Sequence, residues 1–148
     1  MSETGNGMQQ RRARIVQALV DETGIDEALI RKLVHAFYAK IRTDPRLGPI
    51  FELVIGSDWG PHLARMCDFW SSVMLMTGRY KGNPMLAHLR LDGITPDHFA
   101  RWLALFRETA ADICEPSAAE AFIARADNIA KSLELGMFYR PASKPAAV

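Results

Sequence analysis

Apolar side chains recur at helical spacing along nearly the whole chain, and this periodicity is the feature that most constrains the fold. Between about residues 26 and 43, the stripe is formed by Ile30, Leu33, Val34, Phe37 and Ile41. Runs of alternating or β-branched residues, which would predict strands, are missing from the sequence. An amphipathic stripe of this kind has to be covered by other helices. The sequence therefore predicts an all-α fold.

Glycine, proline and capping residues divide the chain into four or five main helices with short pieces between them. We expect the helices over about 9–21, 26–43, 57–77, 95–113 and 116–137, a short turn at 47–51, a loop at 78–84 and a short helical piece at 85–91. Asp44-Pro45 ends the second helix, since proline disfavours helix in the residue before it. Gly78 closes the third helix. Thr95-Pro96 starts the fourth with an N-cap hydroxyl and a proline at the first helical position.

The length of 148 residues fits one domain with a sizeable core. We expect a disordered N-terminal tail over 1–8, a single globular domain over 9–139 and a disordered C-terminal tail over 140–148. No repeat, low-complexity block or long linker divides the middle of the chain. We expect a monomer by default.

The charges are nearly balanced, with 18 Lys and Arg against 17 Asp and Glu and a net charge of +1. This balance argues against binding to nucleic acids or acidic membranes, which requires a field of one sign. The polar start lacks the apolar core of a signal peptide, and no run of about 18 apolar residues predicts a membrane span. Cys67 and Cys114 form no zinc or redox motif. We therefore expect a cytoplasmic protein with reduced thiols.

The sequence lacks the common catalytic and nucleotide-binding motifs, which leaves histidines and large aromatic residues as candidates for chemistry. His62, Met66 and Phe69 share one face of their helix. Arg65 and Ser71 are expected on the other side of that helix. The face that carries His62 is therefore also the apolar face.

His62 and His88 lie on consecutive helical segments. Each is explained either as a half-buried histidine bonded to backbone or water, or as a metal ligand, because neutral imidazole binds iron and copper as well as zinc. Tyr38 and Trp102 are likewise either core aromatics or groups whose polar atoms bind a ligand. His98, in a first helical turn, is expected to be solvated. Two helices that face each other across a flat apolar cofactor would use these residue types together.

Taken together, these residues resemble the truncated haemoglobins, and most of all their bacterial third group. The resemblance covers about residues 25–139 and rests on Phe37-Tyr38, Phe51, Asp58-Trp59-Gly-Pro-His62, Phe69-Trp70-Ser71-Ser72, Thr77-Gly-Arg-Tyr80-Lys-Gly, Pro84-Met85-Leu-Ala-His88-Leu89 and Thr95-Pro-Asp-His-Phe99-Ala-Arg-Trp102. Each piece alone is weak, but their combination in this order is specific. The resemblance implies a shortened globin, a two-over-two helical sandwich around haem b (iron protoporphyrin IX). No Cys-x-x-Cys-His is present, so the haem should be non-covalent.

The resemblance also implies the residues on the two sides of the iron. It places the proximal iron ligand at His88, whose Nδ1–H needs an acceptor from a carbonyl in the Pro84 turn or from Asp92. The distal residues that stabilise a bound ligand would be Tyr38, His62 and Trp102. For His62, a gate that swings outward or a sixth iron ligand are alternatives.

The other predicted cofactor contacts flank these residues, and they are Phe51, Met66, Phe69, Arg79, Tyr80 and Met85. Phe51 would pack on the haem, and Met66 would form an apolar distal wall. By position, Arg79 and Tyr80 would meet a haem propionate.

The function implied is the binding of diatomic ligands such as O2, NO and CO, or of cyanide. Two distal hydrogen bonds would slow O2 release by about two to four decades, which suits reaction with NO or peroxide better than transport. One interpretation is therefore an enzyme, an NO dioxygenase served by a reductase or a peroxidase. A simple O2 carrier or sensor is the second, and a non-haem all-α interaction module is the third.

Overall fold

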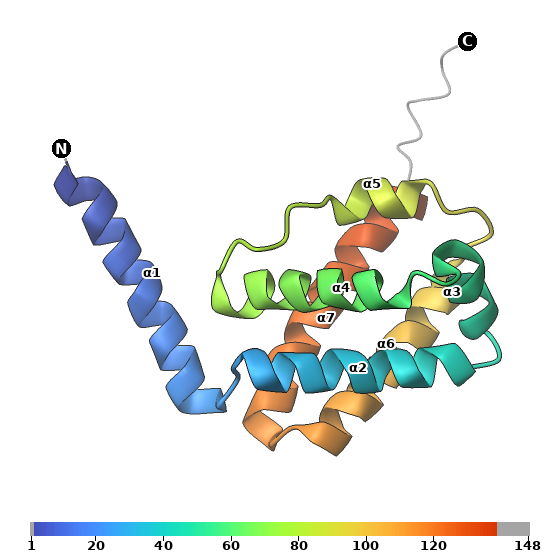
Figure 1. The fold of residues 1–148 in the computed structure, drawn as a ribbon, viewed down its shortest axis with the longest axis horizontal. Helices are drawn as coiled ribbons and strands as arrows, with labels where there is room; N and C mark the ends of the chain where they lie inside the picture. The colour runs from blue at the N-terminus through green and yellow to red at the C-terminus, as the bar shows by residue number, and fades with distance from the viewer. Residues whose placement is uncertain (1, 139–148) are drawn as a thin grey trace, which may run out of the picture.

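The computed structural model describes residues 2–138, with side chains described for 7–138. Its helices, labelled as in Figure 1, are α1 (Ser2–Thr23), α2 (Glu27–Thr43), α3 (Gly48–Ile55), α4 (Trp59–Leu75), α5 (Pro84–Leu89), α6 (Pro96–Ile113) and α7 (Pro116–Phe138). No strand occurs within residues 2–138, and the predicted all-α class is confirmed. None of these helices combines the length and apolar character needed to cross a membrane.

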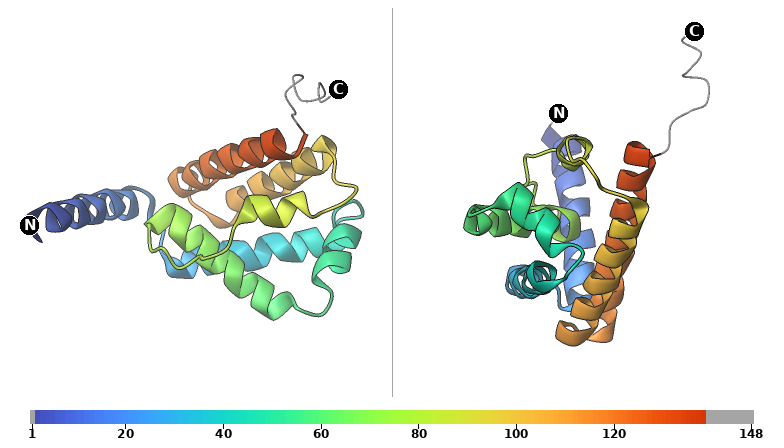
Figure 2. Two further views of the ribbon diagram at one scale, coloured as in Figure 1. Left: turned by 90° about the horizontal axis from the view of Figure 1, so that it is seen from above. Right: turned by 90° about the vertical axis from the view of Figure 1, so that its right-hand side faces the viewer.

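The helices form two crossing layers. α2 and α4 pack side by side and run antiparallel in one layer, while α6 and α7 pack on each other in the second (Figure 1). α2 also packs on α6 and so joins the layers. The right-hand view of Figure 2 shows α5 across one end of both layers, where it packs on α7. This arrangement is the predicted two-over-two sandwich.

The core lies where α2 crosses α6. Phe37 of α2 meets Trp102 and Phe106 of α6 edge-on, with ring centroids 5.2 Å apart in both pairs. Trp70 of α4 stacks on the ring of Phe106, with ring centroids 5.1 Å apart. The apolar stripe predicted for α2 is buried at all its positions, which are Ile30, Leu33, Val34, Phe37 and Ile41. Helical periodicity therefore identified the core face of this helix correctly.

The start of the first helix differs from the expectation. α1 begins at Ser2, whereas the sequence was expected to form a tail up to residue 8. No proline interrupts residues 2–8, and each residue added to an existing helix gains a backbone hydrogen bond. α1 projects away from the two layers and reaches α7 (Figure 1). The tail expected over 140–148 lies outside the described residues.

Two internal boundaries also differ. The turn expected at 47–51 is the start of α3, which has Pro49 in its first turn. Gly48 fits here because a Cβ at this position would lie 2.8 Å from the carbonyl oxygen of Arg42. α4 ends earlier than expected, with Met76 in the left-handed region at φ 57° and Gly78 also at positive φ. The α4–α5 loop, residues 76–83, thus begins with two left-handed residues.

A buried carboxylate ties the end of α2 to α6. Asp44 Oδ1 accepts hydrogen bonds from Nε and Nη2 of Arg101 at 2.8 and 2.6 Å. Its Oδ2 accepts the backbone N–H groups of Arg46 and Leu47 at 3.1 and 2.9 Å. Burial alone would raise the pKa of Asp44, but Arg101 and the two N–H groups outweigh burial and hold this pKa below its ordinary value. Asp44 is therefore ionised at neutral pH.

We predict that Asp44→Asn lowers the free energy of unfolding at pH 7 by about 1–3 kcal/mol, because charge-assisted hydrogen bonds are lost. A carboxyl pKa that is lower in the folded chain stabilises above the unfolded value of 3.8, and this stabilisation is lost as the pH falls through the folded pKa. Urea unfolding between pH 7 and 3 measures this, and the free energies of unfolding of wild type and Asp44→Asn should become more similar in acid. Asp127→Asn, which breaks an exposed ion pair with Arg107, is the control and should cost under about 1 kcal/mol. Equal stability of Asp44→Asn and wild type at pH 7 would contradict the prediction.

Candidate functional site

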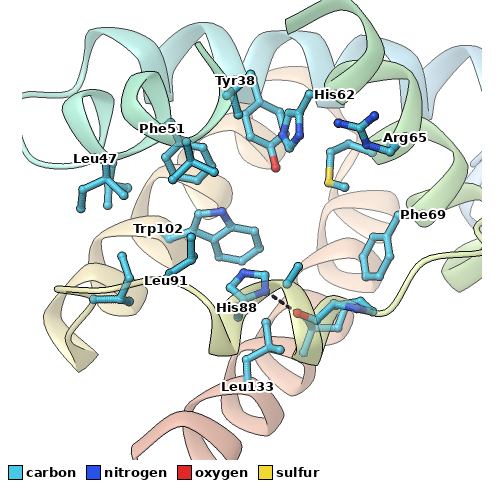
Figure 3. A pocket seen from close by; sticks show the side chains of 18 of the residues that line it. Tyr38, Leu47, Phe51, His62, Arg65, Phe69, His88, Leu91, Trp102 and Leu133 are labelled. Carbon is cyan, nitrogen blue, oxygen red and sulfur yellow. Dashed lines mark hydrogen bonds between the residues drawn. The ribbon is translucent and has the colours of Figure 1, made fainter. Parts of the chain in front are cut away.

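A cavity of about 380 Å³ lies between the two layers and beside α5. This volume falls in the range of about 300–1,000 Å³ that is typical of small-molecule sites. Figure 3 shows side chains converging on it from several helices. Its wall is mostly apolar, and the residues with polar side-chain atoms are Tyr38, Asp58, His62, Arg65, Trp70, Tyr80, His88, His98 and Trp102.

His88 enters the cavity from the α5 side (Figure 3). α5 begins at Pro84, where the N-cap side chain of Asn83 accepts the N–H of Leu86 at 3.2 Å. His88 Nδ1 lies 2.7 Å from the carbonyl oxygen of Pro84, one helical turn earlier. A carbonyl can only accept, so Nδ1 carries the ring proton and Nε2 presents a lone pair. The structure thus selects the Pro84 carbonyl rather than Asp92 as the acceptor.

Tyr38 and His62 face the same cavity from the opposite side (Figure 3). Their rings are perpendicular, with centroids 5.0 Å apart. Tyr38 is 6% exposed, and burial raises the pKa of its hydroxyl, which therefore remains protonated and able to donate. His62 Nε2 is buried without a hydrogen-bond partner among the described residues. Because a buried polar atom without a partner is costly, a bound ligand at this point would satisfy it.

The environment of His62 keeps its ring neutral. Burial lowers the pKa of His62 from 6.5 to about 4, and the positive charge of Arg65 acts in the same direction. Asp58 opposes this shift and is outweighed. Trp59 packs perpendicular to His62 at 5.7 Å between centroids and limits how the ring turns. His62 is thus a neutral, oriented imidazole at the cavity wall.

Trp102 lies in Figure 3 between Phe51 and His88. Its indole stacks on Phe106 at 5.5 Å and 13°, and Phe37 contacts it edge-on. These rings fix the plane of the indole, and they are the same rings that form the core. The N–H of an indole can only donate a hydrogen bond.

Eight of the ten predicted site residues line the cavity together, namely Tyr38, Phe51, His62, Met66, Phe69, Tyr80, His88 and Trp102. Arg79 and Met85 do not line it. The Arg79 guanidinium is engaged elsewhere, with Nη1 3.1 Å from Oε2 of Glu27. Met85 lies on the face of α5 that packs on α7, where a Cβ at Gly136 would collide with its side chain.

Two of the lining residues that were not predicted from the sequence carry basic side chains. Arg65 was expected on the far side of α4, but it is found at the cavity rim in Figure 3. His98 was expected to be solvated, yet it is half-buried and lines the cavity. Its Nδ1 accepts the backbone N–H of Thr95 at 2.9 Å, so the ring proton lies on Nε2. The spacing of His98 one turn before Trp102 was a signal that both share a face.

A two-over-two helical sandwich with histidines on opposite sides of an interlayer cavity defines a protein of the globin class. The chain belongs to the bacterial-like globin family, whose model matches residues 18–134. It is 34% identical over 119 residues to the group 3 truncated haemoglobin of Campylobacter jejuni, covering 78% of this chain and 93% of that protein. The crystal structure of the group III truncated haemoglobin from Campylobacter jejuni matches with a TM-score of 0.75, 33% identity and the same coverage. The predicted family is confirmed, and it implies a haem cofactor and haem-based binding of diatomic ligands.

We predict that His62 titrates near pH 4 in the chain without cofactor. Since the folded pKa lies below the ordinary value of 6.5, the folded chain binds fewer protons than the unfolded chain between these values. The contribution of His62 to stability therefore falls as the pH drops from 6.5 towards 4. NMR titration of the histidine Cε1 protons measures this, with the resonance assigned by its loss in His62→Gln. A midpoint above pH 6 would contradict the buried placement.

Proposed function

We propose that the chain is a haem b protein in which His88 is the proximal iron ligand. Tyr38, His62 and Trp102 form the distal pocket for a diatomic ligand. The observation that carries this proposal is the opposed placement of His88 and the Tyr38–His62 pair across one cavity (Figure 3). The bond from His88 Nδ1 to the Pro84 carbonyl leaves Nε2 as the ligating atom.

The residues present fit this cofactor. Haem is a flat, largely apolar ring with two carboxylates, and the cavity wall is mostly apolar, with Phe51, Met66 and Phe69 among its members. Arg65 and His98 supply N–H groups on the wall that would hold the carboxylates. When bound, the haem would supply an iron that binds a small diatomic ligand.

The distal residues are all able to donate hydrogen bonds. Tyr38 stays protonated because it is buried, Trp102 can only donate, and neutral His62 donates from the nitrogen that carries its proton. In a cavity that excludes water, each bond to a ligand that carries partial negative charge contributes about 1.5–3 kcal/mol. Two such bonds would slow release of the ligand by about two to four decades.

Slow release makes transport a poor use for such a site. We therefore infer redox chemistry on NO or peroxide, with a reductase as electron donor, rather than O2 transport. His62 would present Nε2 to such chemistry, because this atom is buried without a partner among the described residues and burial keeps the ring neutral. Consumption of NO with NADH and a reductase, or oxidation of a dye by peroxide, should be observed. Reversible O2 binding without either turnover would instead identify a carrier or sensor.

We predict that the purified protein, supplemented with haem, shows a sharp Soret band that shifts on reduction and again with CO. His88→Ala should lose haem or bind it far more weakly, because the imidazole that the Pro84 carbonyl holds in place is removed. His35→Ala is the control, since His35 is exposed on α2 and does not line the cavity. Absorption spectra and haem titrations measure both variants. Haem binding at wild-type affinity in His88→Ala would overturn the assignment.

We predict that Tyr38→Phe and Trp102→Phe each speed O2 dissociation by about tenfold to 150-fold, the factor for one lost hydrogen bond of this kind. Stopped-flow measurement of the off-rates tests this. CO is the matched control ligand, because it is less polar and its release should change less. Unchanged O2 off-rates in both variants would show that these residues do not bond to the ligand.

A further inference from the structure

We propose that Glu27 is a positioning residue that anchors the α4–α5 loop and, through this loop, holds α5 and His88 in place. Glu27 lies in the first turn of α2 and does not line the cavity. It acts through a cluster that we call the Glu27 latch, made of Glu27, Ser71, Thr77 and Arg79. The second half of this inference rests on the proposed role of His88.

One carboxylate oxygen joins three parts of the chain in this latch. Oε2 of Glu27 accepts a hydrogen bond from Ser71 Oγ of α4 at 2.8 Å. The same oxygen lies 3.1 Å from Nη1 of Arg79 in the loop. Ser71 is fully buried, although the helical spacing placed it on the side of α4 away from the apolar face. The polar bond to Glu27 explains how its hydroxyl is accommodated there.

A directed chain of hydroxyl bonds continues from Ser71 into the loop. Ser71 Oγ lies 2.8 Å from Thr77 Oγ1. Because the Ser71 hydroxyl donates its only proton to the Glu27 carboxylate, the hydroxyl of Thr77 must be the donor in this second bond. The carboxylate therefore sets the direction of both bonds, and bonds polarised in this way strengthen one another.

The loop is fixed again by the next residue of α4. Ser72 Oγ accepts the backbone N–H of Tyr80 at 2.9 Å and donates to the carbonyl of Asp68. The Tyr80 ring then meets Phe69 edge-on at 5.2 Å, and both rings line the cavity. The latch and this bond from Tyr80 to Ser72 together determine where the loop passes the cavity wall before it enters α5.

α5 needs an external anchor of this kind. It has six residues, and none of them is buried. Its main packing partner is α7. A helix this short, with no buried residue, has little stability of its own. The position of His88 therefore depends on the segments that lead into and out of α5.

The start of the loop also has a conformational cost that the latch offsets. Met76 is in the left-handed region at φ 57°, where a side chain costs roughly 1–2 kcal/mol relative to the right-handed region. Thr77 follows directly, and its bond to Ser71 holds the chain in this conformation. The ion pair alone would not suffice, because Arg79 and Glu27 side chains are 55% and 43% exposed. The hydroxyl chain, which starts from the fully buried Ser71, is what distinguishes the latch from an ordinary surface pair.

Trypsin provides a direct test, because the loop contains two of its cleavage sites, Arg79 and Lys81. In the haem-loaded protein, Glu27→Gln should raise the rate of cleavage after these residues by about tenfold, since it removes the charge that holds the loop. Transfer of haem from Glu27→Gln to apomyoglobin should also be faster than transfer from the wild type. Thr77→Val, which removes a hydroxyl and no charge, should act in the same direction. Mass spectrometry assigns each cut.

Asp127→Asn is the matched control. It breaks the Arg107–Asp127 pair, whose side chains are 53% and 41% exposed, nearly the same as in the Arg79–Glu27 pair. This control should leave both loop cleavage and haem transfer at the wild-type rate. Equal acceleration by Asp127→Asn would show general destabilisation and would overturn the latch.

The remaining outcomes separate the two halves of the inference. Wild-type cleavage in both Glu27→Gln and Thr77→Val would overturn the anchoring of the loop. Faster cleavage without faster haem transfer would overturn the part of the inference that concerns His88. If His88 is not the iron ligand, His88→Ala will retain haem at wild-type affinity. This measurement does not depend on the cleavage rates.

Discussion

The stack of Trp70, Phe106 and Trp102 is the interaction on which the rest of the structure depends. Phe106 is 1% exposed and lies between two indoles, one from each layer, with near-parallel rings on both sides. Large flat rings in contact set a fixed spacing between α4 and α6. Both indoles also line the cavity. The core and the site are therefore built from the same residues, and the width of the cavity follows from the packing of the core.

Polar interactions have a different task, which is to place segments relative to α2. Asp44, just after the end of α2, holds α6 through Arg101, and Glu27, at its start, holds the α4–α5 loop through Ser71 and Arg79. Each pair combines a charge with hydrogen bonds of defined direction, which specifies geometry better than apolar contact does. α2 thus carries Tyr38, the proposed distal residue, between two anchors. One anchor fixes the helix of Trp102, and the other fixes the approach to His88.

Helical periodicity and the capping residues predicted the helices well, because both depend on local spacing. The site was predicted largely through the resemblance of its motifs to a family, since a lone His62 or His88 was also explained as a core histidine. The errors at Arg79 and Ser71 share one cause, which is that partners distant in sequence decide where a side chain goes. Arg79 turns to Glu27, and Ser71 is buried by its bond to the same carboxylate. Spacing along one helix cannot reveal a partner on another.

The two sides of the cavity differ in kind, and this asymmetry has a functional consequence. His88, fixed by the Pro84 carbonyl, presents a lone pair, whereas Tyr38 and Trp102 present donors. A site with an electron-pair donor on one side and proton donors on the other favours a ligand that gains negative charge on binding. The donors that strengthen such binding also delay release, because their hydrogen bonds to the bound ligand have to break before the ligand can leave. Under the proposed function, retention of the ligand follows from these donors, and it favours reaction of the ligand in place over its delivery elsewhere.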